Sequence, residues 1–96
     1  MEIDFPVPIS PLQVEIDGTG KYRKAEIVQD LAGMLLSGKW HNKGSQGEFH
    51  HALVTSIEAI ELYIDADRAR KAFVVAAHAA GMHVLPDDMD EIRKAS

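Results

Sequence analysis

The segment from Asp65 to Gly81 constrains the fold of this 96-residue chain more than any other, because it marks both ends of a single helix. Asp65 can accept hydrogen bonds from the first unpaired backbone N–H groups of a helix, and Gly81 can adopt the left-handed conformation in which many helices end. At about 100° per residue, one face of this helix is apolar and rich in alanine. We therefore expect another element to pack closely against that face, around one large side chain. The face consists of Ala66, Ala69, Phe73, Ala76, Ala77 and Ala80.

Two further helices are predicted before Asp65. Apolar residues recur at helical spacing from about Glu26 to Gly38, where the internal Gly33 either permits close packing or weakens the helix by about 1 kcal/mol. The residues Ser45-Gln46-Gly47-Glu48 form a capping-box pattern that opens the next helix. A very short connection then leads to Asp65, so this helix and the following one should pack as an antiparallel or sharply angled pair. The expected buried stripe of the second helix is Phe49, Leu53, Ile57, Ile60 and Ile64, and its expected solvated side carries Glu48, His51, Thr55 and Glu58.

Strand patterns lie at both ends of the chain. Residues 12–16 alternate apolar and polar, residues 17–20 supply turn chemistry, and residues 21–24 can return as a second strand, which predicts a β-hairpin. Residues 82–85 are short, apolar and followed by proline, which suits a third strand at the edge of the hairpin. Three prolines in residues 1–11 predict an extended arm that is at most an edge strand.

Together these elements predict a small α+β fold, in which a hairpin or three-stranded antiparallel sheet packs on three helices in the order ββααα(β). One domain should cover residues 12–86, between the extended arm at 1–11 and a charged, solvated tail at 87–96. We expect no internal repeats or second domain in a chain of this length.

Composition removes several classes of function. The chain has no cysteine, so disulfides, thiolate metal sites and thiol nucleophiles are excluded. A net charge of −5 makes nucleic acid an unlikely partner, because binding to phosphates usually needs clustered lysine and arginine. No apolar run approaches the ~18 residues of a membrane span, and the acidic start does not suit a signal peptide. We expect a soluble, cytoplasmic protein.

The loop from Lys39 to Gly47 is the mildly basic part of the chain. Lys43, Gly44 and Ser45 precede a helix start, where free N–H groups and the helix dipole favour an anion. The spacing is not that of a phosphate-binding P-loop, and a capping box would use the same donors. Trp40 either anchors the end of the first helix in the core or stacks on a ligand bound at this loop.

No pattern in the sequence predicts a catalytic or metal site, and we expect no cofactor. The adjacent His50 and His51 do not have the three- or four-residue spacing of paired helical ligands, so separate solvated histidines are the simpler interpretation. His51, Thr55 and Glu58 share a helix face, but that face should lack a pocket that excludes water. A metal site would need histidines brought together by the fold; the five histidines are His41, His50, His51, His78 and His83.

Leu62 and Val75 are the candidate interface residues, because each is predicted to project away from the core of its own helix. Apolar side chains left exposed in a monomer can be buried against a second copy or another protein. The favoured function is therefore a non-enzymatic protein-interaction module, either a homodimer or an adaptor. The alternative is a binder of a small anionic ligand, or an enzyme, that uses the basic loop at residues 39–47.

The run Ala-Arg-Lys-Ala-Phe-Val-Val-Ala-Ala-His-Ala-Ala-Gly-Met-His-Val at residues 69–84 resembles the C-terminal signature of the domain of unknown function 982 family, short proteins of rhizobia and related alphaproteobacteria. The order of elements is similar too, with a hairpin, a helix that runs into Trp40, a glycine-containing loop and an alanine-rich helix over residues 5–85. The family often has proline directly after the tryptophan, where this chain has His41. The resemblance implies this fold and a bacterial origin, and it carries over no activity and no functional residue.

Overall fold

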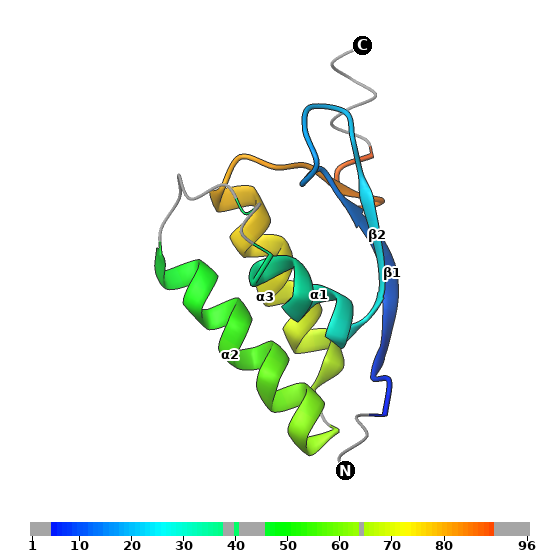
Figure 1. The fold of residues 1–96 in the computed structure, drawn as a ribbon, viewed down its shortest axis with the longest axis vertical. Helices are drawn as coiled ribbons and strands as arrows, with labels where there is room; N and C mark the ends of the chain where they lie inside the picture. The colour runs from blue at the N-terminus through cyan, green and yellow to red at the C-terminus, as the bar shows by residue number, and fades with distance from the viewer. Residues whose placement is uncertain (1–4, 38–39, 41–45, 64, 90–96) are drawn as a thin grey trace.

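The computed structural model describes residues 5–37, 40, 46–63 and 65–89, and it has the predicted α+β architecture (Figure 1). Three strands form one antiparallel sheet in the spatial order β2-β1-β3. The helices α1 and α3 lie between this sheet and α2, which forms an outer layer (Figure 1). None of the helices within the described residues is long and apolar enough to cross a membrane. The elements in chain order are β1 (Pro8–Val14), β2 (Arg23–Ile27), α1 (Val28–Leu35), α2 (Gln46–Leu62), α3 (Ala66–Ala79) and β3 (Val84–Leu85).

The central strand β1 begins earlier than the sequence predicted, at Pro8 inside the expected arm. Its pairing with β2 is irregular between Pro8 and Leu12, whereas β3 pairs only with Gln13 and Val14. The prolines therefore lie where the ladder shifts its register and only one neighbour is present, so a missing N–H is tolerated there. The predicted hairpin and third strand are both confirmed. The first strand extends further towards the N-terminus, and the return strand covers Arg23–Ile27 instead of residues 21–24.

The helix α1 buries Val28, Leu31, Met34 and Leu35, as its spacing predicted. The Asp30 carboxylate accepts the backbone N–H of Glu26 at 3.0 Å and that of Ile27 at 3.3 Å, which stabilises the first turn. Gly33 is exposed, and an added Cβ would meet no described atom within 4 Å. The close-packing interpretation of Gly33 is therefore wrong, and this glycine only weakens the helix.

The helix α2 buries a different face from the predicted one. Thr55 is buried although it was expected in solvent, and Ile57 is 42% exposed although it was expected in the core. The real contact face of α2 is lined by small residues and is turned by roughly 100° from the predicted stripe, because small side chains let α3 approach closely. Phe49, Leu53 and Ile60 pack at the margin of this contact, and Ile64 lies outside the described residues. The buried residues of α2 are Ala52, Thr55, Ser56 and Ala59.

The helix α3 has the predicted apolar face, with the Phe73 side chain fully buried. Gly81 takes a φ of +82°, and the N–H groups of Gly81 and Met82 donate to the carbonyls of His78 and Ala77 at 3.0 and 2.9 Å. This is the expected glycine-terminated helix end. The prediction for Asp65 is only half right: it precedes the helix, but its φ of 58° is left-handed and its side chain caps no N–H.

Candidate functional site

Of the four residues predicted to bind a ligand, the structure describes Trp40. Its ring packs edge-on against Phe73 at a centroid distance of 5.4 Å and lies 6.0 Å from Phe49. These contacts are those of the anchor interpretation, in which the tryptophan closes the core after α1. Lys43, Gly44 and Ser45, the last of which is the first residue of the predicted capping box, lie outside the described residues, and so does His41.

The two predicted interface residues are both exposed: 59% of Leu62 and 54% of Val75 is accessible. Leu62 is the last residue of α2, and Val75 lies in the second half of α3. The two helices run antiparallel (Figure 1), so the positions of Leu62 and Val75 in their helices place them towards opposite ends of the helix pair.

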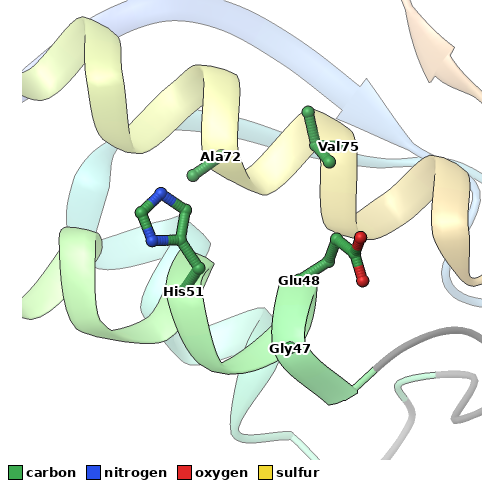
Figure 2. A pocket seen from close by; sticks show the side chains of 5 residues that line it. All are labelled: Gly47, Glu48, His51, Ala72 and Val75. Atoms are coloured by element: carbon green, nitrogen blue, oxygen red, sulfur yellow. The ribbon is translucent and has the colours of Figure 1, made fainter.

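An open groove of about 270 Å³ lies between α2 and α3, next to Val75. Figure 2 shows His51 and Glu48 of α2 facing Ala72 and Val75 of α3 across this groove. Gly47 completes the lining, so the groove includes the start of α2. The Glu48 carboxylate carries negative charge at the place where an anion would approach the helix start, which disfavours anion binding in the groove.

The side chains His51, Thr55 and Glu58 do not form a nucleophilic site. The Thr55 hydroxyl donates to the carbonyl oxygens of His51 and Ala52, at 2.9 and 3.1 Å, within its own helix. Thr55 is also buried in the contact between α2 and α3, so its oxygen is used by the backbone and shielded from any substrate. Next to it, the Ser56 hydroxyl is buried and meets no hydrogen-bond partner among the described residues.

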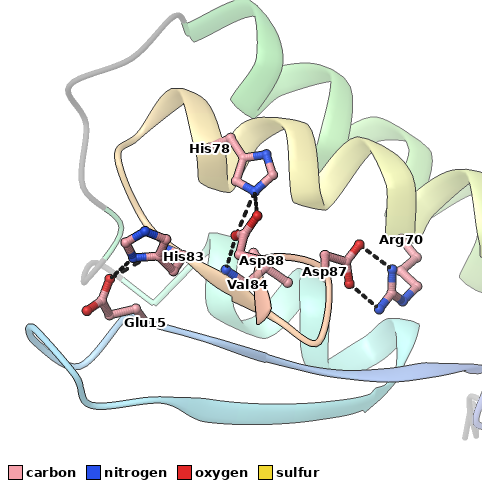
Figure 3. A network of polar contacts seen from close by, with 7 residues as sticks. All are labelled: Glu15, Arg70, His78, His83, Val84, Asp87 and Asp88. Carbon is pink, nitrogen blue, oxygen red and sulfur yellow. Dashed lines mark hydrogen bonds and ion pairs between the residues drawn. The ribbon is translucent and has the colours of Figure 1, made fainter. Parts of the chain in front are cut away.

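A polar network joins the C-terminal turn to α3 and β1, where the sequence predicted a solvated tail (Figure 3). The Asp88 side chain is buried, and its carboxylate accepts the Val84 N–H at 2.6 Å. The same carboxylate lies 2.8 Å from Nε2 of His78 on α3. Asp88 therefore ties the end of α3 to β3, and the prediction of a solvated tail is wrong at this position.

Arg70 and Asp87 form a second link in this network. The Arg70 guanidinium donates to both carboxylate oxygens of Asp87, at 2.9 and 3.2 Å, and to the Ser10 carbonyl of β1 at 2.8 Å. The Arg70 guanidinium holds the pKa of Asp87 below its ordinary value, although partial burial acts in the opposite direction. One arginine thus connects α3, the central strand and the C-terminal turn.

Glu15 provides the third link. Its carboxylate accepts the Gly20 N–H at 2.6 Å and lies 3.3 Å from Nδ1 of His83. The bond from Gly20 is the main cause that holds the pKa of Glu15 below its ordinary value; burial opposes it, and the contacts with His83 assist it. The network therefore fixes the hairpin turn to the segment before β3.

His78 and His83 both border an open hollow of about 260 Å³, each held by a carboxylate on one ring nitrogen. Such pairs can orient a general base or a metal ligand. Gly81 and Met82, which complete the lining of this hollow, supply no nucleophile and no further charged ligand. Across the part of the chain that the structure describes, no three potential metal ligands lie close enough to hold an ion. The network is best explained as a structural clamp.

Comparisons with known proteins identify the family of this chain. A family model described as "Protein of unknown function (DUF982)" matches residues 10–84, which run from within β1 to the first residue of β3 and include β2 and all three helices. A search of the curated proteins found no match, and a search of the solved structures found none. Because the family model covers most of the chain, the protein belongs to the DUF982 family, the family that the run at residues 69–84 resembles.

Proposed function

We propose that the protein is a non-enzymatic interaction module that forms a homodimer through the outer surface of α2 and α3. The observation that carries this proposal is the exposure of large apolar side chains on these two helices. They are Val54, Ile57, Leu62 and Val75, of which 36%, 42%, 59% and 54% respectively is accessible.

The position of α2 in the fold explains why these side chains are exposed. This helix is the outer layer and contacts α1 and α3 with a face of small residues. Its larger apolar residues lie at the margin of that face or beyond it, so folding of one chain does not bury them fully. A single exposed apolar residue is ordinary, but several on two neighbouring helices are typical of a protein contact.

The groups that could act in catalysis support the same proposal. The hydroxyl of Thr55 and the rings of His78 and His83 are all engaged in contacts within the fold. The groove beside Val75 is open and lined partly by a carboxylate, which suits a protein surface better than a closed substrate pocket.

Light scattering after size-exclusion chromatography tests the proposal over a series of protein concentrations. We expect a dimer for the wild type and a shift towards monomer for Val75→Glu and Leu62→Glu, because each places a charge on the apolar surface of α2 and α3. Lys24→Glu is the matched control, since it changes an exposed charge on the sheet. A wild type that stays monomeric at every concentration would refute the homodimer and would favour the adaptor form of the module.

A further inference from the structure

One stripe of α2 has the arrangement of a self-complementary helix seam. His50, Val54, Ile57 and Glu61 are spaced by four, three and four residues, so they lie along one side of the helix. All four are exposed, and the opposite side of α2 is the one buried against the rest of the fold. The centre of the stripe is apolar, and its two ends carry an imidazole and a carboxylate.

The spacing of four, three and four residues is the same when it is counted from either end of the stripe, so the stripe can pair with itself across a two-fold axis. When two copies of α2 cross antiparallel about a two-fold axis between positions 55 and 56, His50 faces Glu61 of the second copy, and Val54 faces Ile57 of the second copy. The two-fold axis makes each of these contacts occur twice. A parallel pair would instead place Glu61 against Glu61 and His50 against His50.

The other charges of α2 favour the same direction. The helix contains three glutamates and no lysine or arginine, and two of the glutamates, Glu58 and Glu61, lie in its last turns. Neither has a described ion-pair partner. An antiparallel arrangement separates these acids and places them near the histidines of the second copy, whereas a parallel one would bring like charges together.

We propose that the occupant of this seam is a second copy of the chain, bound antiparallel through His50, Val54, Ile57 and Glu61 of α2. This inference rests on the homodimer proposed above and assigns the direction and the register of the contact on α2, with Leu62 and Val75 outside the four-residue seam. A helix of 17 residues is about 25 Å long, so the seam alone is smaller than the ~800 Å² per partner of a typical stable interface. We therefore expect dissociation in the micromolar range.

A charge exchange tests the pairing of the seam, with the dissociation constant measured by analytical ultracentrifugation. His50→Glu places two carboxylates opposite each other, and Glu61→Lys places a lysine opposite a histidine. Each should weaken the dimer about tenfold, and the double variant, which places a carboxylate opposite a lysine, should return to within about threefold of the wild type. Lys24→Glu on the sheet should leave the constant unchanged, and circular dichroism checks that every variant is folded.

Disulfide formation tests the direction independently, because the chain has no cysteine of its own. In the antiparallel pair, position 50 faces position 61 of the second copy, and the two positions 50 are about 16 Å apart along the axis, too far for a disulfide. A mixture of His50→Cys and Glu61→Cys proteins should therefore form a mixed disulfide under mild oxidation, while each protein alone should not.

The outcomes separate this inference from the proposed function. A wild-type dimer whose double variant stays as weak as the singles, or whose His50→Cys protein crosslinks with itself, would overturn the antiparallel seam and leave the homodimer standing. A wild type that is monomeric throughout would overturn both.

Discussion

Replacing Asp88 tests whether the C-terminal turn is held as the structure indicates. In Asp88→Ala the buried N–H of Val84 loses its acceptor at 2.6 Å, which costs about 1–3 kcal/mol. The contact with His78, whose side chain is 46% exposed, adds at most about 1 kcal/mol, because solvent screens it. We expect a total loss of about 2–3 kcal/mol in the free energy of unfolding.

Urea and thermal unfolding followed by circular dichroism measure this loss. In a domain of this size about 1 kcal/mol corresponds to roughly 4–8 °C in Tm, so Tm should fall by about 8–24 °C. Asp88→Asn is the matched control: its amide oxygen can still accept the Val84 N–H, so it should lose about 1 kcal/mol or less. His78→Ala should also cost less than about 1 kcal/mol. Equal losses in the Ala and Asn variants, or a loss below about 0.5 kcal/mol in Asp88→Ala, would contradict the reasoning.

Three further predictions follow from single side chains. Gly33→Ala should raise the free energy of unfolding by about 0.5–1 kcal/mol, because its site is helical and open; a loss of stability on urea unfolding would contradict this. Ser56→Ala should be neutral or stabilising by up to about 1 kcal/mol, since it removes a buried hydroxyl without a described partner, whereas a cost above about 1 kcal/mol would reveal a bond to that hydroxyl. Because Arg70 lowers the pKa of Asp87 in the folded state, this carboxylate stabilises the fold above about pH 4 and loses that effect as the pH falls through its lowered pKa. The difference in unfolding free energy between wild type and Asp87→Asn should therefore be largest near neutral pH and vanish in acid, and a difference that is the same at every pH would argue against the pair.

The elements with local signals were predictable from the sequence. The end of α3 depends on Gly81, and its buried face depends on one regular apolar pattern, so both could be derived from neighbouring residues. The face of α2 could not, because this helix has apolar residues on several sides. In α2 the close approach of small residues such as Ala52 and Ala59 determines which face is buried, and the larger Ile57 is left partly exposed. That preference depends on the facing helix and is not visible in the pattern of α2 alone.

The polar network was missed because its partners are distant in the sequence. Arg70 bonds to Ser10, 60 positions earlier, and Glu15 meets His83 across 68 positions. The sequence around Asp87 and Asp88 contains only a proline followed by two acids, which indicates a turn and gives no partner. Val75 was correctly predicted to be exposed, because the apolar pattern of α3 places it away from the buried face. Leu62 is exposed as predicted too, although the buried face of α2 on which that prediction depended was wrong.

Because β1 is the central strand, one of its two edges stays uncovered during much of the synthesis of the chain on the ribosome. β1 and β2 emerge first and can pair at once, but the other edge of β1 is covered only when Val84 and Leu85 follow, some seventy residues later. Until then the nascent chain displays Gln13 and Val14 with unpaired backbone groups, a template for strands of other chains. β3 is the shortest of the three strands and the last to be synthesised. When it pairs with β1, it covers this edge and removes the template for aggregation.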